Sequence, residues 1–429
     1  MNILYSQFIN IKYIVMHKIV VCGEVFSTNL GDNVIHYTFS YLIKKTTFPV
    51  AIEYLDLSLR DKVGGYFYEK PVPQLLNLSK SPKSLVWSLI IRFLPREIST
   101  TLWWLLKWRS QRYKFYKIKL QGASAVFIGG GQLLADNNFD FPLKIYGVSQ
   151  CAKDLHIPTF FCGCGVGSNW SKAAKYLFSK SLTNAISITV RDVESFNRLA
   201  NRIPSIQTKL YADHDIAIAC ADAYEICKQG NSQFIGLGIA SPGALRRHSR
   251  KEYQNYFTDE SLLDFWINVI NELLFINLPF KLFTNGAEED QLFAEKIISC
   301  TSKLHSKPHI LLPSPTDGKS LVEVISGFKA VIAFRLHACV IAYSLEIPTI
   351  GLNWDDKLKS FFQEINQDKY CFEINSVTPK ILINNLIMSI SDGVDISRLN
   401  FMKKETLKRV EDLMHIVDKD ANLGNRPKD

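Results

Sequence analysis

The sequence predicts an α/β protein made of two Rossmann-like domains that face each other across a cleft. Short apolar runs alternate with helical patterns along nearly the whole chain, as in parallel sheets covered by helices. Several runs end directly in glycine, and the alternation weakens once, between Ile218 and Ser232, before it resumes. This interruption divides the elements into two series, one on each side of a linker.

The first series contains six candidate strands, each an apolar run of suitable length. They are residues 18–22, 50–56, 125–129, 158–162, 186–190 and 207–211. Glycines follow three of them, at Gly23, Gly129–Gly131 and Gly163. Ligands of an open α/β sheet bind outside the carboxyl ends of its strands, so we expect these glycines to border a site.

The second series predicts another sheet and its helices. The expected strands are 234–240, 280–286, 309–313, 330–334 and 349–353, and the intervening helices include 259–276 and 289–303. We therefore divide the 429 residues into four parts, at about 150 residues per domain. These are an extension (1–17), an N-terminal domain (18–225), a C-terminal domain (232–395), and a closing amphipathic helix with the tail (396–429).

Composition and cysteine usage narrow the class of protein. Hydrophobic residues make up 47% and charged residues 21% of the chain, which is typical of globular proteins. The nine cysteines include no CxxC pair and no zinc spacing with histidine, so we expect no metal and reduced thiols, as in the cytoplasm. No apolar run reaches the 18 residues of a spanning helix, and no export signal is visible.

The net charge of +9 lies in one window, residues 80–119, which holds ten Lys/Arg residues and one acid. Four of the seven tryptophans lie there too. Apolar faces flanked by Lys and Arg are typical of interfacial helices, so this basic, Trp-rich insertion predicts contact with an anionic membrane rather than nucleic acid. The alternative is a helical hairpin that covers the sheet and exposes a solvated basic face.

Two clusters follow strands of the first series. In GEVFSTNLGDNVI, residues 23–35, Asn29, Gly31 and Asp32 precede a helix. Asp32 alone is also an ordinary N-cap, but its place after the first strand favours a ligand. In FIGGGQLLADN, residues 127–137, Gly130 and Gly131 allow close approach to the backbone. Neither cluster contains a nucleotide fingerprint.

Arginine and histidine mark two other strand ends. Arg191 ends an apolar strand, where its charge must be paired, for example with Asp192, or bound to an anion. Arg335 and His337 lie two residues apart where a buried strand enters a helix, so they share a face. Arginine binds carboxylate or phosphate and histidine exchanges a proton near neutral pH, although a buried structural histidine remains the alternative.

These clusters, in this order, resemble the polysaccharide pyruvyl transferase family over residues 19–362. The matching segments are NLGD at 29–32, GGG at 129–131, GCGVG at 163–167, VRDVES at 190–195, the region around Asp213, FRLHA at 334–338 and NWDDK at 353–357. The resemblance implies a GT-B-like fold. It also implies transfer of pyruvate from phosphoenolpyruvate to a sugar, as a ketal across two hydroxyls.

The resemblance implies that Arg335, Leu336 and His337 belong to the donor site, with Arg191 as a further anion contact. Lys357 and the loop from Gly238 through Ser241 are additional candidates for donor binding. We expect His337 to act as general acid toward the vinyl carbon and Asp32 to bind or deprotonate the acceptor hydroxyl. The acceptor side is expected to comprise Asn29, Gly31, Gly130 and Gly131, without metal or cofactor.

Membrane contact fits an acceptor sugar carried on a polyprenyl diphosphate at the cytoplasmic face of the membrane, in cell-surface polysaccharide biosynthesis. A nucleotide sugar or a finished polymer remains open as the acceptor. Two other functions remain open. A glycosyltransferase of the same fold would use a nucleotide sugar, and would need groups for the base and ribose. A non-catalytic, membrane-associated polysaccharide assembly protein would tolerate replacement of Arg335 and His337.

Overall fold

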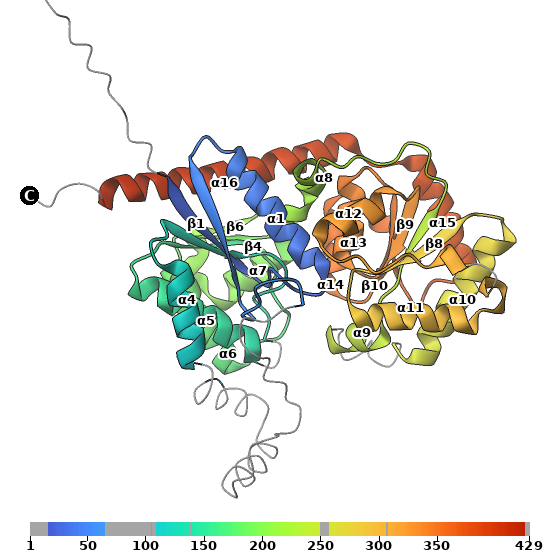
Figure 1. Ribbon diagram of the computed structural model, residues 1–429, viewed down its shortest axis with the longest axis horizontal. Coiled ribbons are helices and arrows are strands. Elements are labelled where there is room, and N and C mark those ends of the chain that lie inside the picture. Colours follow the sequence, from blue (N-terminus) through green and yellow to red (C-terminus); the bar gives the residue numbers. More distant parts are fainter. Residues whose placement is uncertain are drawn as a thin grey trace, which may run out of the picture.

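The computed structural model describes residues 16–64, 104, 109–136, 139–248, 257–305 and 308–424. Two parallel sheets form two halves that lie side by side, and the long helix α16 (Ile396–Gly424) runs across both (Figure 1). The strand order is β2-β1-β3-β4-β5-β6 in the first sheet and β11-β10-β9-β7-β8 in the second. The α/β class with two Rossmann-like halves is confirmed.

The first half alternates strands and helices in the order of the sequence. Its strands are β1 (His17–Gly23), β2 (Val50–Asp56), β3 (Ala125–Gly129), β4 (Thr159–Cys164), β5 (Ser187–Val190) and β6 (Leu210–Ala212). Its helices are α1 (Leu30–Lys45), α4 (Arg109–Leu120), α5 (Asp140–Asp154), α6 (Lys172–Asn184), α7 (Val193–Arg202) and α8 (Cys220–Tyr224), with 3-10 turns η3 (Pro204–Lys209) and η4 (Ile216–Ala219).

The second half repeats this arrangement. Its strands are β7 (Ile235–Gly238), β8 (Phe280–Phe283), β9 (Ala330–Ala333), β10 (Thr349–Asn353) and β11 (Cys371–Glu373). Its helices are α9 (Pro242–His248), α10 (Asp259–Phe275), α11 (Glu288–Cys300), α12 (Gly318–Ser326), α13 (Leu336–Ser344), α14 (Asp356–Glu364) and α15 (Pro379–Asp392).

Two expected strands need correction. Residues 204–209 form the 3-10 turn η3, so β6 is shorter and begins later than the expected 207–211. Residues 309–313 form no strand, because only Leu311 pairs with Leu282, as an isolated bridge. Prolines at 308 and 313 flank this segment, and proline has no N–H for a ladder.

The two halves share one apolar core. Residues of β1 alternate between two faces, with Ile19 and Val21 in one cluster and Val20 and Cys22 in the other. The cluster of Ile19 and Val21 continues through α1 and η4 into the second half. Burial of apolar surface therefore docks the two sheets with their carboxyl ends near one another.

A buried charge network secures the carboxyl end of β1. Glu24 accepts hydrogen bonds from Arg60, from Ser58 and from Lys144 at 3.2 Å. Burial alone would raise the pKa of Glu24, but Lys144 and then Arg60 outweigh it and lower the pKa from 4.5 to about 2. The ionised carboxylate therefore stabilises the folded chain.

We predict that Glu24→Gln lowers the free energy of unfolding at pH 7 by about 3 kcal/mol. The folded-state pKa of Glu24 is depressed, so its stabilisation is complete above pH 5 and is lost as the pH falls from 4.5 toward 2. In urea unfolding at pH 3, the difference in unfolding free energy between wild type and variant should be less than half of the difference at pH 7. Equal differences at both pH values would contradict this, and exposed Glu260→Gln serves as the control.

Candidate functional site

The segment from Asn29 to Asp32 lies between the two halves. The backbone N–H of Leu30 donates to the carbonyl of Asn285, in the second half, at 3.0 Å. A β-carbon at Gly31 would lie 2.4 Å from Nδ1 of His337, so only glycine lets the imidazole ring pack here. The first turn of α1 thus positions a side chain that the other sheet supplies.

His337 lies in the first turn of α13, a helix buried on all sides. Its Nε2 is 3.7 Å from Oδ2 of Asp215, and Nη1 of Arg191 is also 3.7 Å from that oxygen. These distances are longer than direct hydrogen bonds, so the contacts are ion pairs when the imidazole is protonated. The Asp215 carboxylate therefore faces a guanidinium from its own half and an imidazole from the other half.

Each of these three side chains carries a buried polar atom without a hydrogen-bond partner among the described residues. The atoms are Nε2 of His337, Oδ2 of Asp215 and Nη2 of Arg191. The three residues are 7%, 6% and 4% exposed. An unsatisfied buried polar group costs about 1–3 kcal/mol, so such a cluster is typical of a ligand site rather than of a core.

Asp215 is ionised at neutral pH. Burial would raise its pKa, but His337 and then Arg191 outweigh burial, and the pKa lies below its ordinary value of 3.8. Its other oxygen accepts a 3.0 Å hydrogen bond from the N–H of Ala217, which fixes the carboxylate at the start of η4. The sequence pattern indicated the nearby Asp213 but not Asp215, because an Asp before a short apolar run is also an ordinary helix cap.

Glycines of two loops allow the polar side chains to approach. A β-carbon at Gly165 would lie 2.7 Å from Nη2 of Arg191, and one at Gly131, where φ is +69°, would lie 3.0 Å from Oδ1 of Asp32. The N–H of Gly165 donates to the carbonyl of Gly131 at 2.8 Å. The contacts form a closed ring through Asp32, Gly131, Gly165, Arg191, Asp215, His337 and Gly31.

Arg335 caps α13 and is already paired. Its guanidinium donates to both oxygens of Asp290, with Nη2 at 3.0 and 2.7 Å and Nε at 3.2 Å. Asp290 is fully buried, and it also accepts the N–H of Ser241 at 2.7 Å. The arginine side chain is 14% exposed, and Nη1 has no hydrogen bond within the described ranges. Nη1 is therefore the nitrogen available to a ligand.

The other expected donor-site residues have different surroundings. A β-carbon at Gly238 would meet Ala333 and Phe283 inside the sheet, and the N–H of Ser241 is bonded to Asp290. Lys357 pairs with Asp355 at 2.7 Å, and its Nζ lies 5.1 Å from the centre of the Trp354 ring. Leu336, between Arg335 and His337, is half-buried. None of these contacts joins the ring of contacts around Asp215.

His36 is a site residue that gave no signal in the sequence. Its Nδ1 is 2.6 Å from the carbonyl of Asp32 and its Nε2 is 3.0 Å from that of Gly129. Burial lowers the pKa of His36 below its ordinary value of 6.5. A β-carbon at Gly130 would lie 3.0 Å from this ring. His36 thus holds α1 against the glycine loop and positions Asp32.

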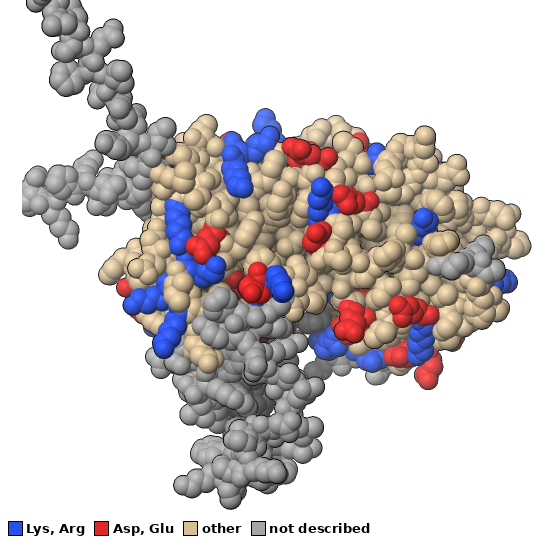
Figure 2. Space-filling view, viewed as in Figure 1, with Lys and Arg blue, Asp and Glu red and all other residues tan. Residues whose placement is uncertain are grey.

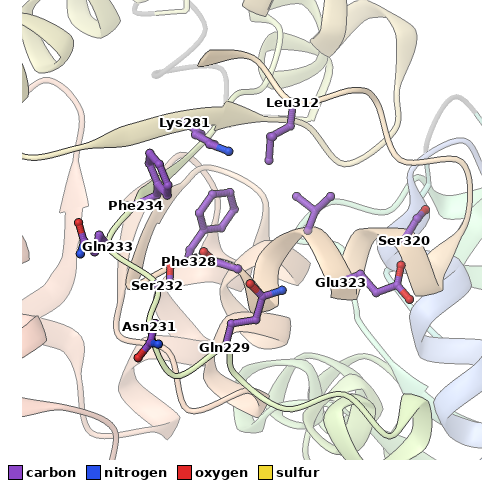
Figure 3. A pocket seen from close by; sticks show the side chains of 12 residues that line it. Gln229, Asn231, Ser232, Gln233, Phe234, Lys281, Leu312, Ser320, Glu323 and Phe328 are labelled. Atoms are coloured by element: carbon purple, nitrogen blue, oxygen red, sulfur yellow. Dashed lines mark hydrogen bonds between the residues drawn. The ribbon is translucent and has the colours of Figure 1, made fainter. Parts of the chain in front are cut away.

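A pocket of about 630 Å³ lies elsewhere, at the amino ends of the second sheet (Figure 3). Its lining includes Gln229, Phe234, Lys281, Glu323 and Phe328, which come from the linker, β8, α12 and the turn after α12. It contains no residue of the ring of contacts. No group of three or more His, Cys, Asp or Glu side chains in the described part of the chain is arranged to hold a metal.

Two parallel α/β halves, docked around a polar interdomain site that contains arginine, histidine and aspartate, define a GT-B-like protein. A model of one family, polysaccharide pyruvyl transferase, matches residues 2–356. The chain belongs to this family. No curated protein sequence matches it.

Solved structures share the fold at low sequence identity. The UDP-GlcNAc 2-epimerase of Methanocaldococcus jannaschii has a TM-score of 0.57 at 11% identity and covers 94% of this chain and 100% of its own. The Neisseria meningitidis enzyme bound to UDP-GlcNAc has 0.53 at 13%, covering 93% and 100%. The S. aureus MnaA–UDP structure has 0.53 at 12%, covering 96% and 100%. These similarities establish the architecture alone.

We predict that Gly31→Ala displaces the His337 ring, because the added methyl would lie 2.4 Å from Nδ1. Turnover should fall at least 100-fold, while the thermal midpoint falls by no more than about 3 °C, the shift that follows from about 2 kcal/mol in a chain of 429 residues. The control is Gly230→Ala, where a β-carbon meets nothing within 4 Å. Wild-type turnover in Gly31→Ala would mean that the contact with His337 is dispensable.

Proposed function

We propose that the protein transfers the pyruvyl group of phosphoenolpyruvate to two hydroxyls of a sugar, forming a ketal and releasing phosphate in cell-surface polysaccharide biosynthesis. The single observation that supports this most is the buried cluster of Arg191, Asp215 and His337, with an unpartnered polar atom on each. All three residues lie inside the segment that the family model matches.

The donor carries a carboxylate and a phosphate, so its site needs guanidinium groups. Arg191 offers Nη2, which has no partner in the part of the chain described, and Arg335 offers Nη1. Asp290 holds the Arg335 fork in one orientation through two of its nitrogens. A fork fixed before binding loses less conformational entropy when the anion arrives.

The chemistry requires one proton donor and one proton acceptor. His337 gives its Nε2 proton to the terminal carbon of phosphoenolpyruvate, a sugar oxygen bonds to C2, and that hydroxyl loses its proton to Asp32. The C2–O bond to phosphate then breaks, and the phosphate leaves with the bonding electrons. The departing phosphate takes up the proton from Asp32. A second hydroxyl bonds to C2 and gives its proton to the deprotonated imidazole of His337, which closes the ketal and restores the acid.

Asp215 and His36 act as positioning residues in this scheme. The Asp215 carboxylate faces Nε2 at 3.7 Å, a distance at which it attracts a protonated imidazole and thereby orients the ring. His36 donates a hydrogen bond from Nδ1 to the carbonyl of Asp32, which fixes the turn that presents the Asp32 carboxylate. Both residues thereby set the orientation of a neighbour that contacts the substrate.

Incubation of the purified protein with phosphoenolpyruvate and a panel of sugar acceptors tests the proposal, with acceptor-dependent phosphate release as the readout. A parallel panel of nucleotide sugars tests the glycosyltransferase alternative. Transfer from a nucleotide sugar, with no phosphate released from phosphoenolpyruvate, would replace this proposal with that alternative. Absence of any transfer would favour the assembly-protein alternative.

We predict that His337→Ala lowers turnover by about 10²–10⁴-fold, because general acid catalysis contributes that much. Arg335→Lys should lose nearly as much, since an ammonium cannot make the two-pronged contact with Asp290 or present Nη1. Circular dichroism and the melting temperature check that both variants fold. Near-wild-type turnover by His337→Ala would show that it is not the acid.

The membrane part of the proposal concerns residues 80–119, of which the structure describes only Trp104 and the helix α4 onward. Arg112 is buried and donates to the carbonyl of Leu57 at 2.6 Å, and Lys119 pairs with Glu53 at 2.9 Å. Lys114 and Lys117 are exposed. Basic side chains gather over α4 on the left of the face in Figure 2. No described helix has the length and apolarity required to cross a bilayer.

We predict that the double change Lys114→Glu and Lys117→Glu weakens binding to vesicles of phosphatidylglycerol by about tenfold or more. Each basic residue near an anionic surface contributes about 1 kcal/mol, and the change reverses two charges. Flotation at low salt measures binding, and Lys303→Glu on the other half is the control. Equal flotation of all three proteins would remove α4 from the membrane contact.

A further inference from the structure

Asn285 carries the most completely buried unpaired amide of the interdomain contact. It follows β8 and is 1% exposed. Neither Oδ1 nor Nδ2 has a hydrogen-bond partner among the residues described. Two unsatisfied atoms on one buried side chain cost about 2–6 kcal/mol together, and a core position would favour an apolar residue. The Asn285 side chain therefore suits a ligand that both donates and accepts hydrogen bonds.

The position of Asn285 links it to the site. Its carbonyl accepts the N–H of Leu30 at 3.0 Å, so its backbone is fixed against the segment that carries Asn29 and Gly31. The next residue, Gly286, has φ of +95°, and a β-carbon there would lie 2.7 Å from Leu30. The loop of Asn285 and Gly286 is thus fixed against the first turn of α1, on which His337 packs.

A second buried hydrogen-bond acceptor without a partner among the described residues lies on Asn29, next to Leu30. Oδ1 of Asn29 is buried without a partner within the described ranges, while its Nδ2 lies 3.5 Å from Oδ2 of Asp32. Two amide oxygens from opposite halves therefore require hydrogen-bond donors. Phosphoenolpyruvate offers only acceptor oxygens when ionised, so it cannot satisfy them. A sugar hydroxyl both donates and accepts.

We propose that Asn285 is a specificity-determining residue that binds a pair of hydroxyls on the acceptor sugar, with Oδ1 accepting from one and Nδ2 donating to the other. This inference rests on the proposed function, since it names the substrate that Asn285 contacts. Oδ1 of Asn29 accepts a third hydroxyl hydrogen. The acceptor is therefore held by both halves of the molecule, not by the first half alone.

The test compares wild type with Asn285→Ala. The probes are the 4-nitrophenyl glycosides of galactose, glucose, mannose and N-acetylglucosamine, together with their mono-deoxy analogues. Binding is measured by saturation-transfer NMR without phosphoenolpyruvate, and kcat/KM by phosphate release with it. We expect Asn285→Ala to weaken glycoside binding and acceptor kcat/KM by 10- to 100-fold, since a polar pocket discriminates strongly against a missing partner.

If Asn285 had a purely structural role, Asn285→Ala would change other measured quantities. The affinity for phosphoenolpyruvate, measured by calorimetry, should stay within twofold in Asn285→Ala, and the melting temperature should not fall by more than about 3 °C. The deoxy glycoside that lacks the bound hydroxyl should lose no further affinity in the variant. Thr284→Val is the matched control, because Thr284 is equally buried and its hydroxyl lies 3.4 Å from Oε1 of Gln291 in the same half.

The outcomes separate this inference from the proposed function. Asn285-dependent glycoside binding without phosphate release would refute the pyruvyl transfer and leave the sugar contact standing. Unchanged glycoside binding in Asn285→Ala, an equal loss in Thr284→Val, or no binding of any glycoside by the wild type would overturn the inference. In those cases the amide contacts ordered water only.

Discussion

The packing of the His337 ring on the α-carbon of Gly31 is the constraint on which the site depends. It brings the first turn of a helix from one sheet against the first turn of a helix from the other, at a separation that leaves no room for a β-carbon. The contacts on either side of Gly31 also join separate segments closely. The N–H of Leu30 donates to the carbonyl of Asn285, and Asp32 lies against Gly131. Three consecutive residues, Leu30, Gly31 and Asp32, therefore set the geometry of both halves of the site.

Charge compensation decides which cations of the site can act. Arg335 is bonded through two nitrogens to the fully buried Asp290, so its charge is paired and Nη1 is the guanidinium nitrogen without a hydrogen bond to the described residues. Arg191 and His337 share the single carboxylate of Asp215 at 3.7 Å. With the imidazole protonated, that trio has a net positive charge, which suits a small multiply charged anion. Lys357 is paired outside this group.

The sequence was sufficient to predict most of the strands and the polar residues that stand directly at strand ends. The expected strands 50–56, 125–129 and 349–353 match β2, β3 and β10, because their apolar runs are bounded by turn residues. What it could not predict are partners brought together by the fold. Asp290 belongs to an acidic helix start and Asn285 to an ordinary turn sequence, and each gains a role only through a contact more than forty residues away or across the domain boundary.

The glycines show why local sequence and distant chemistry are coupled in this fold. Gly165 and Gly131 lie where side chains of Arg191 and Asp32 pass close to the backbone, and Gly31 admits His337. A glycine-rich loop in an α/β sheet is usually associated with backbone N–H groups that bind phosphate. Here the missing β-carbons make room for the protein's own charged side chains. The same architecture, shared with UDP-GlcNAc 2-epimerases at 11–13% identity, can thus present an arginine, histidine and aspartate at the interdomain boundary.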